Sequence, residues 1–288
     1  MKFMEYLNIF KGKTFIIKYG GSIMNNKSAQ KAFFEDVAKM KLAGINIVIV
    51  HGGGPEISNW LNKVGLESKF INGLRVTDKD TMEIVEMVLS GKLNKGITAS
   101  LSKEGVKAIG ISGSDSNLIV AKKKYANIDN NQVDIGFVGE VTSINKYLLL
   151  NLIEKNYVPV ISPIGYDSQY SKYNINADSV SAFISSVLEA EKLIILTDVE
   201  GVYKDIQHKS SLINSITIDE IKTYIDSGII TGGMIPKMEC CIDALEKGTK
   251  SVHLIDGRKE HCLINDILSN SGTIINWKGG IKKCQKAI

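Results

Sequence analysis

Arginine is almost absent from this chain of 288 residues. Of its 35 basic residues, 33 are lysine, and only Arg75 and Arg258 are arginine. Lysine is therefore the default cation here, and the two exceptions are candidates for tasks that need a planar guanidinium. The net charge of +4 is dispersed and forms no basic stripe with interleaved aromatic residues, so we expect no nucleic-acid partner.

Long hydrophobic runs, paired cysteines and clustered histidines are also missing. No apolar run reaches the length of a membrane span, and the N-terminus has no signal-peptide pattern, so we expect a cytoplasmic protein with no membrane partner. The four cysteines form no CxxC motif, and the four histidines fall in no ligand spacing with them. We therefore expect reduced thiols and no protein metal site.

A P-loop is missing as well. Gly12-Lys13-Thr14 resembles the end of that motif, but Leu7 stands where the first glycine should be. A strand-like segment also follows it, where a P-loop would open a helix. Any phosphate-binding site must therefore be built in another way.

Short β-branched segments alternate with amphipathic ones along the chain. This alternation predicts an α/β fold in which a mostly parallel sheet is covered by helices on both faces. The polar stretch Pro163–Tyr173 predicts a boundary between two lobes, 1–170 and 171–288, and Val133–Val141 predicts a hairpin around Gly136 and Gly139. The predicted strands are Thr14–Lys18, Ile45–Val50, Val106–Ile111, Val158–Ile161, Leu193–Leu196 and Ser251–Ile255. The predicted helices are Ser28–Leu42, Thr81–Leu101, Asn145–Lys155, Asp178–Leu188, Asp219–Ser227 and Met238–Lys247.

Two lysines stand beside glycine-rich turns far apart in the sequence. The motif Lys18-Tyr19-Gly20-Gly21 follows the first predicted strand, and Gly232-Gly233-Met234-Ile235-Pro236-Lys237 precedes a predicted helix. Between them, Asn174-Ile175-Asn176-Ala177-Asp178 alternates amides and a carboxylate where a loop should become a helix. Two point cations, a carboxylate able to hold them, and exposed backbone N–H groups are what phosphoryl transfer requires. The pattern predicts a kinase without a P-loop.

Two further motifs indicate where an anionic substrate would bind. His51-Gly52-Gly53-Gly54-Pro55 ends the second predicted strand, and Pro55 at a helix start favours an anion-binding helix N-terminus. We interpret the His51 ring as a buried structural group. Arg75 stands just before a predicted helix and suits a carboxylate, although a surface pairing with Asp78 or Asp80 is the alternative.

In this order, these segments resemble the amino-acid kinase family, from Phe10 to about Thr273. The string Met87-Val88-Leu89-Ser90-Gly91-Lys92-Leu93-Asn94-Lys95 adds to the resemblance. The resemblance implies a three-layer αβα sandwich and ATP-dependent phosphorylation of the side-chain carboxylate of N-acetyl-L-glutamate, the second step of arginine synthesis. Mg²⁺ should arrive with ATP. A carboxylate acceptor is already ionised at neutral pH, because its reference pKa is about 4.3, so no general base is needed.

The resemblance also implies residue roles. Lys18 and Lys237 would stabilise the transferring phosphoryl group while Asp178 organises both lysines. The acetylated amino acid would be held by Gly53, Gly54, Arg75 and Asn174, with Asn176 close by. ATP would be bordered by Gly20, Gly21, Thr197, Asp198, Val199, Gly201, Val202, Tyr203, Gly232, Gly233 and Met234. The N-terminal lobe would take the amino acid and form the dimer, and the C-terminal lobe would take ATP.

Some alternatives stay open. The resemblance implies a homodimer at least. Arginine-inhibited hexameric relatives carry a longer N-terminal helix and a Gly-x-Gly-Thr motif, where this chain has Asn270-Ser271-Gly272-Thr273, so both the hexamer and inhibition by arginine are undecided. A sibling kinase acting on an N-modified aminoadipate is a second candidate, and a catalytically inactive amino-acid sensor is a third.

Overall fold

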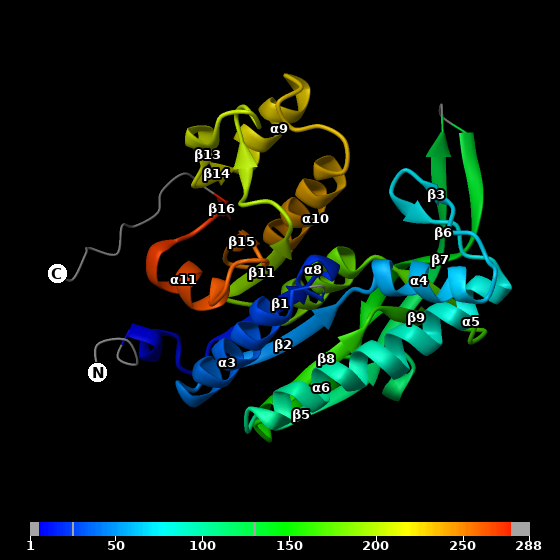
Figure 1. Ribbon diagram of the computed structural model, residues 1–288, viewed down its shortest axis with the longest axis horizontal. Helices are drawn as coiled ribbons and strands as arrows, with labels where there is room; N and C mark the ends of the chain where they lie inside the picture. The colour runs from blue at the N-terminus through cyan, green and yellow to red at the C-terminus, as the bar shows by residue number, and fades with distance from the viewer. Residues whose placement is uncertain (1–5, 25, 129–130, 278–288) are drawn as a thin grey trace.

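The computed structural model describes residues 6–24, 26–128 and 131–277, and Figure 1 shows its path. An eight-stranded sheet forms the centre. Its neighbours pair in parallel from β5 to β15, and β16 pairs antiparallel with β15, which confirms the predicted mostly parallel sheet. In spatial order the strands are β14 (Ser215–Thr217), β16 (Thr273–Asn276), β15 (Val252–Asp256), β11 (Lys192–Thr197), β1 (Thr14–Tyr19), β2 (Asn46–His51), β8 (Val158–Ser162) and β5 (Ala108–Ser112).

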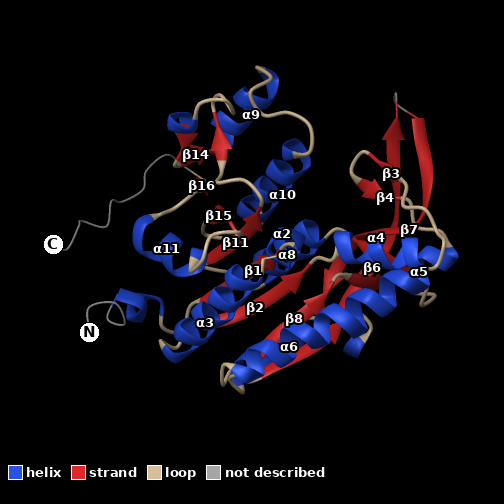
Figure 2. Cartoon of the chain, viewed as in Figure 1, coloured by secondary structure: helices blue, strands red, loops and turns tan. Residues whose placement is uncertain are grey.

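Both faces of this sheet are buried, because successive residues of a strand point to opposite sides. Phe15 and Ile17 of β1 belong to one buried cluster, whereas Ile16 belongs to another. The first cluster contains side chains from α3 (Lys27–Leu42), α6 (Asn94–Lys103) and α11 (Cys262–Ser269). The second contains side chains from α7 (Lys146–Glu154), α8 (Ala177–Val187) and α10 (Met234–Glu246). Figure 2 shows α3 and α6 alongside the central strands.

The remaining elements lie around the sheet. A small barrel contains β6 (Ile119–Ile128), β7 (Asn131–Ile144), β9 (Ile164–Tyr166) and β10 (Lys172–Ile175). Two short ribbons pair β3 (Phe70–Ile71) with β4 (Leu74–Arg75), and β12 (Val202–Tyr203) with β13 (Leu212–Ile213). The other helices are α2 (Gly21–Met24), α4 (Gly54–Lys63), α5 (Lys79–Glu86), the π-helical η2 (Met87–Leu93) and α9 (Ile218–Asp226), with 3-10 turns η1 (Asn8–Phe10), η3 (Asp115–Asn117) and η4 (Lys209–Ser211).

The predicted hairpin at Val133–Val141 is wrong. This segment belongs to the single long strand β7, which pairs antiparallel with β6. Its glycines permit close approach of neighbouring chain segments: a Cβ on Gly136 would lie 2.1 Å from the carbonyl oxygen of Thr77, and a Cβ on Gly139 would lie 2.6 Å from Cβ of Tyr173. Glycine inside a strand can mark such a close approach of another segment.

Helix boundaries differ from prediction at two places that matter for the site. The segment predicted as one helix, Thr81–Leu101, runs through α5, the π-helical η2 and α6. The helix predicted to begin at Met238 begins at Met234, so Lys237 lies in its first turn.

No helix in the described ranges combines the length and apolar character that crossing a membrane would need.

Candidate active site

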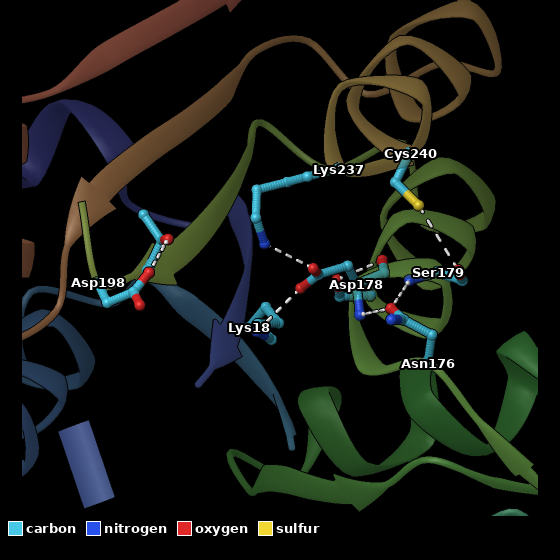
Figure 3. A network of polar contacts seen from close by, with 9 residues as sticks. Lys18, Asn176, Asp178, Ser179, Asp198, Lys237 and Cys240 are labelled. Carbon is cyan, nitrogen blue, oxygen red and sulfur yellow. Dashed lines mark hydrogen bonds and ion pairs between the residues drawn. The ribbon is translucent and has the colours of Figure 1, made fainter. Parts of the chain in front are cut away.

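Asp178 lies between the two lysines that the sequence singled out (Figure 3). Its Oδ1 is 3.0 Å from Nζ of Lys18, and its Oδ2 accepts a hydrogen bond of 2.7 Å from Nζ of Lys237. The three side chains are only 12–16% exposed. Residues 160 and 59 positions apart thus share one largely buried ionic cluster, with one carboxylate for two ammonium groups.

Local structure explains how these groups reach one place. Lys18 stands near the carboxyl end of the central strand β1, where open α/β sheets bind ligands. Asp178 lies in the first turn of α8, and the cap of that helix is Asn176, whose Oδ1 accepts from the N–H groups of Asp178 (2.8 Å) and Ser179 (3.2 Å). The Asp178 carboxylate is therefore free to bind the lysines. Lys237 lies in the first turn of α10.

The ionic cluster stays charged at neutral pH. Burial alone would raise the pKa of Asp178, but the charges and hydrogen bonds of Lys18 and Lys237 outweigh it and hold that pKa well below its ordinary value. Burial would lower the pKa of Lys237, but the charge and hydrogen bond of Asp178 raise it above its ordinary value. The carboxylate of Asp178 and the ammonium group of Lys237 are therefore both charged at neutral pH.

Glycine is required at two turns beside the cluster. A Cβ on Gly20 would lie 2.7 Å from the carbonyl oxygen of Leu196 and 3.3 Å from Nζ of Lys18. A Cβ on Gly53 would lie 2.5 Å from a methyl of Leu93 and 2.6 Å from one of Leu89, both on the π-helix. These contacts are shorter than side chains tolerate, so both turns need glycine for close packing.

A cavity of about 220 Å³ opens beside Lys18 and Asp178. All five residues that the sequence assigned to an amino-acid substrate line it. Its lining includes Lys18, Gly21, Gly53, Gly54, Arg75, Asn174, Asn176 and Asp178, together with Gly52, Ile57, Phe70, Gly73, Leu74, Leu89, Val138, Pro163, Ile175 and Ala177. The cavity therefore combines cationic, amide and apolar groups around one end of the ionic cluster.

Arg75 is a buried charged residue, with only 6% of its surface exposed. Its Nη2 donates to the carbonyl oxygen of Gly54 and to Oγ of Ser58, each at 2.9 Å, and its Nη1 donates to Oγ of Ser68 at 2.6 Å. Burial lowers the pKa of its guanidinium from the ordinary value. Arg75 makes no ion pair with Asp78, whose side chain instead caps α5 by accepting from Thr81 N at 2.8 Å.

A second cavity, of about 1140 Å³, adjoins the other side of the cluster. Lys237, Gly232 and Gly233 line it, and it shares Asn176 and Asp178 with the first cavity. The ionic cluster therefore stands where two spaces meet. The predicted nucleotide residues Thr197, Asp198, Val199, Gly201, Val202 and Tyr203, with Gly20 and Met234, line neither of these two cavities.

The loop after β11 is held by contacts within itself and by one contact with β16. Oγ1 of Thr197 donates to Asp198 at 3.2 Å, the N–H of Val202 donates to Oγ1 of Thr273 at 2.8 Å, and the hydroxyl of Tyr203 donates to Glu200 at 2.8 Å. The described contacts do not join this loop to the ionic cluster.

Among the described residues there is also no group of three or more side chains that could hold a metal ion.

Sequence reasoning did not single out Ser58, Ser68 and Phe70. All three surround Arg75: the serines accept its hydrogen bonds, and the ring of Phe70 lies 4.6 Å from the guanidinium carbon. The only sequence signal was the nearness of Ser68 and Phe70 to Arg75 along the chain, and serine so close to a turn is too common to carry an assignment.

Comparisons with known proteins define the class of this fold and site. The model of the amino acid kinase family matches residues 13–256, and the chain belongs to that family. The acetylglutamate kinase of Clostridium acetobutylicum is 57% identical over 99% of this chain and 96% of its own length, and that of Desulforamulus reducens is 49% identical over 93% and 92%.

Solved structures agree with this classification. A protein from Streptococcus mutans superposes with a TM-score of 0.75 at 31% identity, covering 92% of this chain and 99% of its own. Carbamate kinase from Giardia lamblia superposes with a TM-score of 0.66 at 16% identity, covering 92% and 99%. At that identity the second likeness concerns the fold alone. The predicted family and αβα architecture are thus confirmed.

Proposed function

We propose that this protein transfers the γ-phosphoryl group of ATP to the side-chain carboxylate of N-acetyl-L-glutamate, giving N-acetyl-L-glutamyl 5-phosphate, the second step of arginine synthesis. Relatives that carry the name acetylglutamate kinase match nearly the whole chain at up to 57% identity. The observation that carries the proposal is the Asp178 carboxylate held between Lys18 and Lys237, where two cavities meet.

The chemistry needs charge stabilisation more than proton transfer. The acceptor carboxylate is ionised at neutral pH, so it can attack the γ-phosphorus without a base. The difficulty is to bring two anions together and to stabilise the charge that spreads over the phosphoryl oxygens. Lys18 and Lys237 are point cations held on rigid elements, β1 and the first turn of α10. Asp178 keeps both in place, so little reorganisation is needed during transfer.

We place the two substrates on opposite sides of the cluster. N-Acetyl-L-glutamate would occupy the smaller cavity, where Arg75 meets its α-carboxylate, and Asn174, Gly53 and Gly54 meet its amide and reacting end. ATP, carrying Mg²⁺ as its phosphate complex, would present its γ-phosphate near Lys237, with Gly20, Gly21 and the glycine turn Gly232-Gly233 beside the phosphates. The loop Thr197–Tyr203 would border the base and ribose.

This placement extends to the lobes. Residues 1–170 would supply most of the amino-acid site and the dimer contact, with Asn174 and Asn176 added from the second lobe, and residues 171–288 would supply most of the nucleotide site. We propose a homodimer at least, with the hexamer and arginine inhibition undecided. Light scattering measures the oligomeric state, and ADP release with and without arginine measures inhibition; a monomer under all conditions would refute the dimer.

A substrate panel tests the proposed reaction. ADP release is measured with MgATP and equal concentrations of N-acetyl-L-glutamate, N-acetyl-L-aspartate, an N-acylated aminoadipate and free L-glutamate. We expect the highest kcat/KM with N-acetyl-L-glutamate. Preference for the aminoadipate would assign the chain to the sibling reaction, and no ADP release with any acceptor would favour a sensor without activity.

A further inference from the structure

We propose that Ser58 and Ser68 are positioning residues for Arg75, and that through Arg75 they set the affinity of the site for the α-carboxylate of its amino-acid substrate. The proposal rests on the function proposed above and names how one of its binding groups is oriented. Neither serine lines the substrate cavity, whereas Arg75 does. Their effect on a substrate must therefore pass through the guanidinium.

The hydrogen bonds leave the guanidinium little freedom to turn. Both protons of Nη2 are used, one by the carbonyl oxygen of Gly54 and one by Oγ of Ser58, at 2.9 Å each. One proton of Nη1 goes to Oγ of Ser68 at 2.6 Å, and Oγ of Ser68 in turn donates to Ser58 at 3.3 Å. Three acceptors fix the plane of the group, since a guanidinium donates in its own plane.

The three acceptors come from two separate places in the chain. Ser58 lies on α4, Gly54 begins that helix, and Ser68 precedes β3. The ring of Phe70, on β3, lies 4.6 Å from the guanidinium carbon and adds a cation–π contact to one face. The orientation of Arg75 therefore depends on how α4 packs against the β3–β4 ribbon.

The guanidinium protons of Arg75 that have no protein acceptor determine how Arg75 could bind a substrate. Among the described contacts, the Nε proton and one Nη1 proton of Arg75 have no acceptor, and they are available to a carboxylate in the cavity that Arg75 lines. Without a serine acceptor, a buried Nη proton would be left unpaired, and the group would turn to satisfy it. The remaining protons would then point in a less favourable direction for the substrate.

A double-mutant cycle tests this positioning role. Ser68→Val and Ser68→Thr have nearly the same shape, but only threonine keeps the hydroxyl. With saturating MgATP, we expect Ser68→Val and Ser58→Ala each to raise the KM for N-acetyl-L-glutamate about five- to tenfold, with kcat and the KM for ATP within about twofold of wild type. Ser68→Thr should stay close to wild type. Ser251→Ala, which removes a half-buried hydroxyl that donates to Glu191 O at 3.1 Å, is the matched control.

The cycle is completed in the Arg75→Lys background. There, Ser68→Val should change the KM by less than about twofold, because the guanidinium that the serine orients is gone. An equal fold increase in both backgrounds would show that Ser68 acts independently of Arg75 and would overturn the inference. An unchanged KM in Ser68→Val and Ser58→Ala would overturn it as well. A wild-type chain that releases no ADP with N-acetyl-L-glutamate would instead refute the proposed function itself, which this inference requires.

Discussion

Asp178→Asn is the substitution that tests the proposed site most directly. It removes the one charge that holds Lys18 and Lys237 together and changes the side-chain shape very little. Because the three side chains are only 12–16% exposed, water can compensate only partly for the lost contacts. Removing one partner of a buried ion pair typically costs about 3–5 kcal/mol, which is an upper bound here because the cluster lies at the wall of two cavities. A protein with about 5–15 kcal/mol of stability would remain folded.

The substitution should also lower turnover. With two ammonium groups repelling each other and no carboxylate between them, neither lysine is held where the phosphoryl oxygens gain charge. Losing one such preorganised group typically costs about 3 kcal/mol, so we expect kcat to fall by about a hundredfold or more. The loss of activity cannot come from a lost helix cap, because the residue that caps α8 is Asn176 and not Asp178. ADP release and urea unfolding, measured on the same preparation, separate the two effects.

The pH dependence gives an independent check on Asp178. Its pKa in the folded protein lies below the unfolded value, so its stabilisation is present above the unfolded pKa of about 3.9 and is lost as pH falls toward the folded value. The stability deficit of Asp178→Asn should therefore shrink below about pH 5. The matched control is Asp134→Asn, which breaks an exposed pair of 2.7 Å with Lys123 and should leave turnover unchanged. A folded Asp178→Asn enzyme with kcat within a few-fold of wild type would refute the proposed role.

Three further outcomes are expected. Lys18→Ala and Lys237→Ala should each lower kcat by about a hundredfold or more while changing either KM much less, and near-normal kcat would remove that lysine from the mechanism. Arg75→Lys should raise the KM for N-acetyl-L-glutamate about tenfold, or about 1.4 kcal/mol, with the KM for ATP unchanged; the opposite pattern would place Arg75 at the phosphates. Burial lowers the pKa of His51 to about 4 in the folded protein, below the unfolded value of about 6.5. Between these two pH values the unfolded chain binds a proton that the folded protein does not, so the protein should lose stability as pH falls from about 6.5 to 4. Urea unfolding of wild type and His51→Gln at pH 7 and pH 5 measures this, and equal pH sensitivity in both proteins would contradict it.

His51 shows which properties of a buried residue the sequence predicts and which it does not. From the sequence we interpret this histidine, which stands before three glycines, as a buried structural group, and the ring is fully buried. Its Nδ1 donates to the carbonyl oxygen of Gly52 at 2.9 Å, and its Nε2 accepts from Asn94 at 3.2 Å. The partner Asn94 could not be predicted, because it follows a π-helical turn that shifts the register of the preceding helix. A local pattern indicates that a group is buried, but the packing of a distant element decides what satisfies it.

Sequence alone determined the α/β class, the mostly parallel pairing of the apolar strands and the identity of the charged groups. Those features depend on periodicity, on turn chemistry and on the scarcity of arginine in a chain rich in lysine. Tertiary structure decided which groups meet: the 2.7 Å and 3.0 Å contacts of Asp178 join segments from β1, α8 and α10, and the acceptors of Arg75 come from α4 and the approach to β3. Tertiary structure also decided that β7 is one long strand and not the expected hairpin, because its glycines make room for Thr77 and for Tyr173 of β10. Electrostatic and hydrogen-bond energies depend on distance and burial, and these quantities exist only once the chain has folded.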